Sequence, residues 1–68
     1  MILPATQIRI GTKISEIDGL WTVTDIIERT PESITTKMCN DCSGTDRTIV
    51  RTYWTDAKVW AFNAGKEV

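Results

Sequence analysis

The closest approach to a reactive motif is a pair of cysteines three positions apart, in Cys39-Asn40-Asp41-Cys42. Two thiolates on a tight turn can supply half of a tetrahedral zinc site, which needs four ligands. The chain has no other cysteine and no histidine. Zinc binding by Cys39 and Cys42 would therefore require a dimer with two thiolates from each subunit, or Asp41 or Asp46 as a further ligand.

The same cysteine pair has two other interpretations. A redox or disulfide pair is one, but a redox Cys-x-x-Cys usually opens a helix, whose N-terminus lowers the thiol pKa. Here the pair is expected in a loop between strands. The other interpretation is that two cysteines happen to lie near one hairpin tip, and we favour it over zinc.

A second group of residues combines positive charge with an aromatic ring. A strand expected over residues 47–54 carries Arg47, Arg51 and Tyr53 on one face. Lys37 is expected on the neighbouring strand. Guanidinium groups suit phosphate or carboxylate, and a tyrosine ring offers a stacking face. This stripe is a candidate site for a nucleotide, a nucleic acid or an acidic protein segment. We favour a solvated strand face, whose charges pair across strands and block aggregation at the edge.

Three tryptophans are a large aromatic load for so short a chain. Trp21 shares its parity with Val23, and Trp54 shares its parity with Val50, so the pattern predicts that both indoles face the core. Exposed tryptophans would instead anchor an interface, because tryptophan is enriched at binding hot spots. Trp21 is kept as a candidate partner-binding residue on that ground.

Trp60 lies in an apolar run that the alternation alone leaves open. Either Trp60 and Phe62 face the core, or Val59 and Ala61 do, since both pairs cannot lie inside on a strand with one buried face. Trp60 is the other aromatic candidate for a partner-binding role.

The elements that would position these side chains are predicted to be strands. Ile, Val and Thr fill 24 of the 68 positions, and β-branched side chains suit a pleated, half-buried surface. The alternation predicts a bulge near Asp25 or Ile26. Turns are expected at Asp18-Gly19 and at Thr30-Pro31-Glu32-Ser33. Strands are expected over residues 8–14, 20–29, 34–38, 47–54 and 58–62.

Both ends of this pattern resemble the SH3-like small barrels. One part is Ile10-Gly11-Thr12-Lys13-Ile14 followed by Asp18-Gly19-Leu20-Trp21-Thr22-Val23; the other is a strand, a helical turn at Thr55-Asp56-Ala57 and a short strand. The resemblance covers about residues 8–62. It implies a small five-stranded barrel or sandwich with one short helical turn near Asp56. It also implies binding rather than catalysis, because SH3-like barrels host many kinds of binding protein.

Composition sets several further expectations. The chain forms one domain over residues 1–68, with a flexible lead-in over 1–6 and a frayed tail over 63–68. Eight Lys and Arg against nine Asp and Glu give a formal charge of −1, which argues against general nucleic-acid affinity. The absence of histidine excludes Ser-His-Asp and Cys-His catalysis. Without a signal peptide or a long apolar run, a soluble cytoplasmic protein is expected.

These features together predict a non-enzymatic binding module that acts by protein–protein interaction or self-assembly, without a cofactor. A homo-oligomer is expected, because so small a core leaves large apolar side chains uncovered. A viral or mobile-element protein that inhibits or sequesters a host component would fit this size. The alternatives are nucleotide or nucleic-acid binding through the stripe, and a zinc-linked structural subunit.

Overall fold

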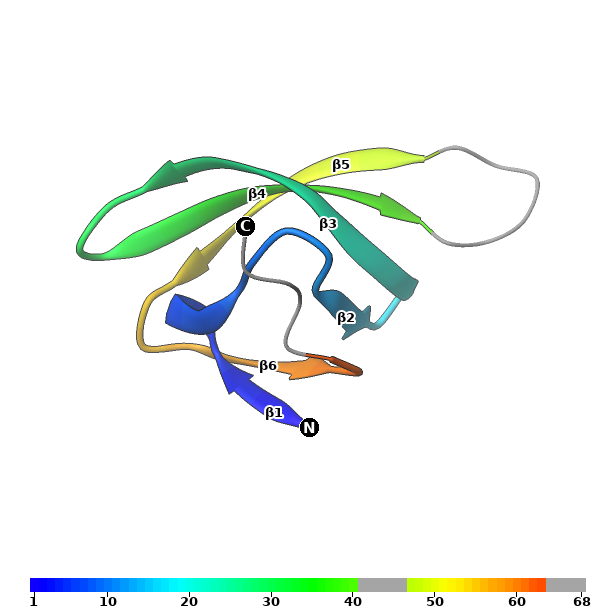
Figure 1. The fold of residues 1–68 in the computed structure, drawn as a ribbon, viewed down its shortest axis with the longest axis horizontal. Helices are drawn as coiled ribbons and strands as arrows, with labels where there is room; N and C mark the ends of the chain where they lie inside the picture. The colour runs from blue at the N-terminus through cyan, green and yellow to red at the C-terminus, as the bar shows by residue number, and fades with distance from the viewer. Residues whose placement is uncertain (41–46, 64–68) are drawn as a thin grey trace.

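The computed structural model describes residues 1–40 and 47–63, which form one antiparallel sheet of six strands (Figure 1). The strand order is β1-β6-β2-β3-β4-β5. This confirms the all-β prediction, with one strand more than the five expected. The strands are β1 (Ile2–Pro4), β2 (Lys13–Glu16), β3 (Gly19–Arg29), β4 (Ser33–Asn40), β5 (Thr48–Trp54) and β6 (Lys58–Ala61).

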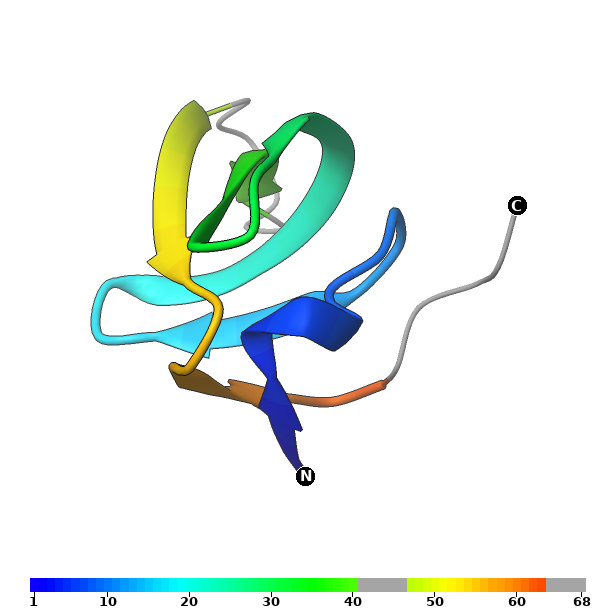
Figure 2. The same cartoon turned by 90° about the vertical axis from the view of Figure 1, so that its left-hand side faces the viewer.

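The long strand β3 bends the sheet around the core. Its register against β4 shifts between Val23 and Asp25 and again between Ile26 and Glu28. Such irregularities increase local twist and bend a strand, and Figure 2 shows β3 curving so that β4 and β5 lie over β2 and β6. The predicted bulge is confirmed. The sheet is not closed, because β1 and β5 remain its two edges.

The concave side of the bent sheet holds the hydrophobic core. Trp21 at its centre is fully buried, and its indole N–H donates to the Asp18 carboxylate over 2.9 Å. The core is completed by side chains from the 3-10 turn η1 (Ala5–Gln7) and from every strand except β5. The buried hydrophobic residues are Leu3, Ala5, Ile8, Ile14, Trp21, Val23, Ile34, Met38, Val59 and Ala61.

The inward face of β5 is the opposite of the predicted one. Val50 and Trp54 were expected inside, but they are 61% and 65% exposed. Ile49 and Tyr53 pack against the core instead. Cross-strand register explains this, because Tyr53 pairs with the buried Ile34, and directly paired side chains lie on one face of a sheet.

The first predicted strand is also shorter than expected, because residues 9–12 form a turn. The Thr12 N–H donates to the Arg9 carbonyl over 3.1 Å, and Gly11 has a φ of +92°. A positive φ at the third position of a turn favours glycine. The strand therefore begins at Lys13 rather than Ile8, and Ile10 is left exposed.

The helical turn expected near Asp56 is a tight turn without helix. The Ala57 N–H donates to the Trp54 carbonyl over 2.9 Å and reverses the chain between β5 and β6. Among the described residues, the one helical segment is the 3-10 turn η1. The additional strand β1 lies in the expected lead-in, where Leu3 pairs with Val59. Of the expected tail, residues 64–68 lie outside the described part.

Candidate functional site

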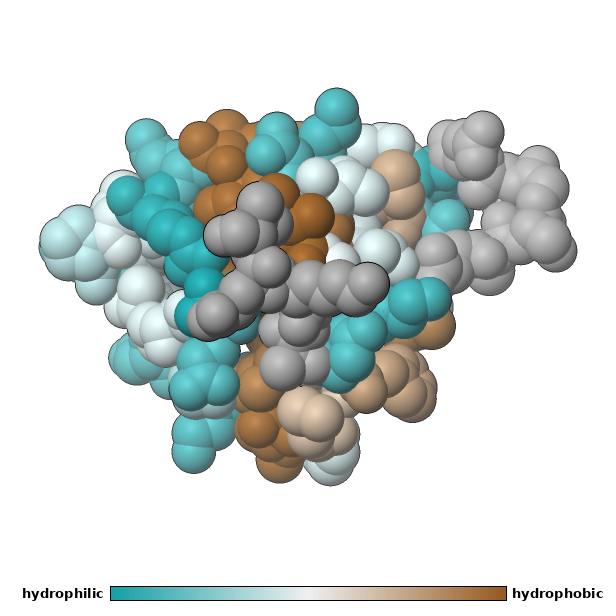
Figure 3. Space-filling model, viewed as in Figure 1, coloured by the Kyte–Doolittle hydropathy of each residue, from teal (hydrophilic) through white to brown (hydrophobic). Residues whose placement is uncertain are grey.

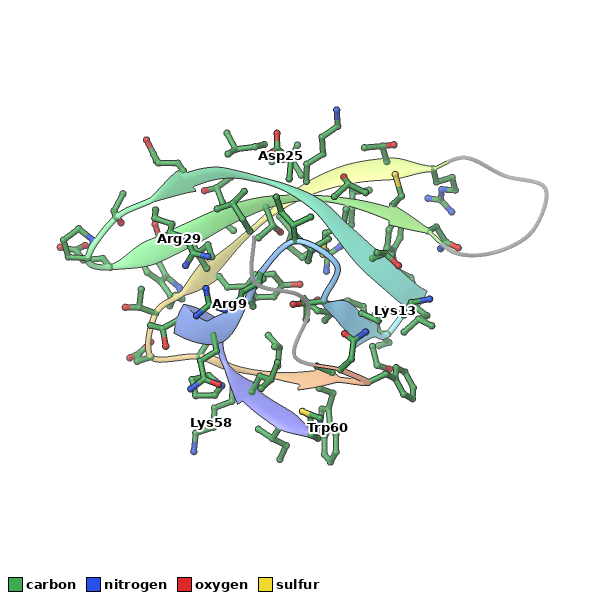
Figure 4. The ribbon with its side chains drawn as sticks, in the orientation of Figure 1. Arg9, Lys13, Asp25, Arg29, Lys58 and Trp60 are labelled. Carbon is green, nitrogen blue, oxygen red and sulfur yellow. The ribbon has the colours of Figure 1, made fainter. Side chains whose placement is uncertain are left out.

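An exposed apolar surface covers β1 and β6 on the side away from the core. Ile2 and Trp60 are direct cross-strand partners and are 53% and 63% exposed. The structure thus decides the open question about β6, with Val59 and Ala61 inside and Trp60 outside. Trp60 points away from the body of the molecule (Figure 4).

Two further side chains extend this surface. Phe62 is 67% exposed and its N–H donates to the Lys13 carbonyl over 2.9 Å, while Met1 lies beside it. We call Met1, Ile2, Trp60 and Phe62 the apolar face. Figure 3 shows hydrophobic residues along the lower side of the molecule, where β1 and β6 lie.

The apolar face contains a small hollow of about 230 Å³, lined by Met1, Ser15, Trp60, Ala61 and Phe62. Ser15 pairs with Trp60 across β2 and β6, and Leu20 pairs with Ser15 on β3. A row of outward side chains therefore runs from Ile2 across four strands. The hollow is smaller than the roughly 300–1,000 Å³ typical of small-molecule pockets, so the surface suits a protein contact better than an enclosed ligand.

Three polar side chains from β2 and β5 form a second cluster. Glu16, at the end of β2, accepts a hydrogen bond from the Tyr53 hydroxyl and lies 3.5 Å from an Arg51 guanidinium nitrogen. Burial raises the pKa of Tyr53 far above its usual range, and the hydrogen bond to the Glu16 carboxylate raises this pKa further. Tyr53 thus remains a neutral hydrogen-bond donor at physiological pH.

The predicted basic stripe is divided by the structure. Lys37 lies on β4, the neighbouring strand as expected, but it pairs with Val50 on the outward face of the sheet. Arg51 and Tyr53 are on the inward face, where they hold Glu16. Arg47 is exposed before β5 begins, and its carbonyl accepts from the Asn40 N–H. Lys37 therefore does not share a surface with Arg51 and Tyr53.

The cysteine pair is only partly within the described residues. Cys39 lies in β4 rather than in a loop, half-buried, with its sulfur 3.4 Å from the Thr48 hydroxyl. Cys42 and the two aspartates considered as further zinc ligands lie outside the described part. Within residues 1–40 and 47–63, no group of three or more Cys, Asp or Glu is placed to hold a metal.

Sequence reasoning named Trp60 as a binding candidate but missed Ile2, Met1 and Glu16. The contribution of Ile2 depends on β1, a three-residue strand that contains a proline and shows no alternation. Glu16 is isolated in the sequence, and only folding brings it to Arg51 and Tyr53. Trp21, the other aromatic candidate, is buried in the core and offers no surface to a partner.

Comparisons with protein-family models, with curated proteins and with solved structures find no match. In the described residues, no helix is long and apolar enough to span a membrane.

Proposed function

We propose that this protein works by protein–protein contact through the apolar face, and that its simplest form is a two-fold dimer of this chain. The observation that carries the proposal is the pairing of two exposed side chains, Ile2 and Trp60, on adjacent strands next to Phe62. With aromatic side chains burying about 150–250 Å² each, Trp60 and Phe62 alone leave about 200–300 Å² uncovered. Apolar patches of about 300–600 Å² on monomers are often functional.

The position of the apolar face supports a second copy as its occupant. It adjoins β1, which is an edge of the sheet, and an edge strand offers unpaired backbone groups to another chain. A two-fold contact places the same patch on both sides, so apolar side chains meet apolar side chains. We infer a weak dimer, because the uncovered area lies below the roughly 800 Å² per partner of a standard interface.

The chemistry of the polar cluster supports binding rather than catalysis. A general acid or base works best with a pKa near the operating pH, whereas the pKa of Tyr53 is raised away from neutrality. Arg51 and Tyr53 are also engaged by Glu16, which leaves them less suited to grip a phosphate. Nucleotide binding through this stripe is therefore the less favoured function.

An SH3-like barrel remains our proposal for the fold family. Its support is the succession of three elements: the strand β5, a tight turn at Thr55 and Asp56, and the short strand β6. The proposal carries the expectation of a binding role.

Sedimentation equilibrium at micromolar to millimolar concentrations tests the proposed dimer. The parent chain should show a concentration-dependent mass above 7.7 kDa. Trp60→Ser should shift it to the monomer, because the substitution removes the largest ring of the apolar face. Trp54→Ser is the matched control, since Trp54 is equally exposed on a different strand. A parent chain that stays monomeric throughout, or a Trp60→Ser variant that dimerises as well as the parent, would contradict the proposal.

A further inference from the structure

A shallow groove lies at one end of the sheet, where the turn between β3 and β4 meets the turn between β5 and β6. It has a volume of about 470 Å³ and is lined by Pro31, Glu32, Trp54, Thr55 and Asp56. These residues come from two turns far apart in the sequence, one joining β3 to β4 and one joining β5 to β6. Figure 1 shows both turns at the same end of the sheet.

Hydrogen bonds hold the two turns together. The Thr55 N–H donates to the Glu32 carbonyl over 2.8 Å, and the Thr55 hydroxyl donates to the Pro31 carbonyl over 3.1 Å. The first turn is closed by the Thr30 hydroxyl, which accepts from the Ser33 N–H over 2.9 Å. The groove is thus built before any ligand arrives, and preorganisation reduces the entropy that binding must overcome.

The lining of the groove is aromatic and acidic. The Trp54 side chain is 65% exposed, although a tryptophan usually favours burial. Glu32 and Asp56 are both exposed, and no hydrogen bond or ion pair engages either carboxylate within residues 1–40 and 47–63. An indole face beside two unpaired carboxylates attracts a cation, through the ring quadrupole and through charge.

We propose that this groove binds an arginine side chain presented by a partner protein. A guanidinium is planar, weakly hydrated and able to stack on an indole while its N–H groups reach carboxylates, whereas an ammonium is a compact and strongly hydrated point charge. A shallow, open groove lined by one indole and two carboxylates matches the planar cation. The groove is separate from the apolar face, so the two sites can be tested independently.

The test follows the three indole N–H signals by NMR while short peptides are added. The probes are Gly-Arg-Gly, Gly-Lys-Gly and Gly-citrulline-Gly, with blocked ends; citrulline keeps the shape of arginine without its charge. The arginine peptide should shift the Trp54 signal and leave the Trp21 signal in place. The lysine peptide should bind more weakly, and the citrulline peptide should bind at least about fivefold more weakly, the factor that corresponds to a modest cation–π contact.

Variants then assign the site. Trp54→Ala should abolish the response, which is read from backbone signals of the two turns. Glu32→Gln and Asp56→Asn should each weaken the arginine peptide about two- to fivefold, the range of an exposed ion pair, and added salt should reduce the difference. Trp60→Ser is the control, because it disrupts the apolar face and should leave peptide binding unchanged. Equal binding of the citrulline or lysine peptide, an unshifted Trp54, or carboxylate variants that bind like the parent would overturn the proposal.

Discussion

Replacing Tyr53 by phenylalanine removes a single oxygen from the cluster around Glu16. The ring keeps its packing against the core, while the hydrogen bond to the Glu16 carboxylate is lost. A hydrogen bond to a charged group contributes about 1.5–3 kcal/mol. The Glu16 side chain is 19% exposed and keeps Arg51 at 3.5 Å, so water replaces part of what is lost. We therefore expect a cost at the lower end of the range, about 1.5–2 kcal/mol.

That loss is measurable against the total stability. At about 0.05–0.15 kcal/mol per residue, a chain of this length has a free energy of unfolding of about 3–10 kcal/mol. Urea denaturation followed by tryptophan fluorescence gives the difference, because unfolding brings the buried Trp21 into water. The same substitution in a Glu16→Gln background should cost less, because a neutral amide is a weaker acceptor than a carboxylate. A cost that is the same in both backgrounds would refute the assignment to this hydrogen bond.

The same hydroxyl predicts a pH dependence. Because the pKa of Tyr53 is raised in the folded state, its contribution to stability is fully present below the unfolded value of about 10 and is lost as pH rises through the folded pKa. Tyr53 is the only tyrosine, so phenolate absorbance reports it alone. The native chain should ionise well above pH 10, and the urea-unfolded chain near 10. Ionisation of the native chain near 10 would contradict the structure.

The remaining predictions concern a turn and the cysteines. Gly19→Ala should destabilise the fold by about 1–3 kcal/mol in urea denaturation, because Gly19 has a φ of +132° that alanine rarely adopts. A stability equal to that of the parent would show that the turn relaxes. The double variant Cys39→Ser, Cys42→Ser should keep its melting temperature and sedimentation mass, because a serine at 39 can still bond Thr48. Loss of assembly after chelation of the parent would instead favour zinc.

Much of the fold could be predicted because alternation and turn residues act locally. Ile34, Thr36 and Met38 share a buried face as their parity predicts, and Pro31 lies in the turn between β3 and β4. The bulge in β3 was visible in the sequence as the break at Ile26. A side-chain period of two and the fixed φ of proline follow from covalent geometry, so they need no tertiary context.

Tertiary structure decided which face of β5 is inside. Both faces of that strand carry apolar residues. The charge of Arg51 made its own face look exposed, so the sequence favoured the face of Val50 and Trp54 as the buried one. Pairing with β4 places Arg51 beside the buried Thr36, and Glu16 from a distant strand compensates its charge. Long side chains can bury their stems while their charged ends stay in water. The alternation of side chains therefore defined the two faces of β5, and only the cross-strand register showed which face is buried.

The candidate sites depended still more on tertiary structure. The sequence by itself determined that exposed aromatic residues were available, and it named Trp60 among the binding candidates. Only the folded chain sets Ile2 beside Trp60, and only the hydrogen bonds of Thr55 bring Glu32 to the groove of Trp54. The physical reason is that a surface joins residues distant in the chain, whereas propensity and periodicity describe neighbours within a single element.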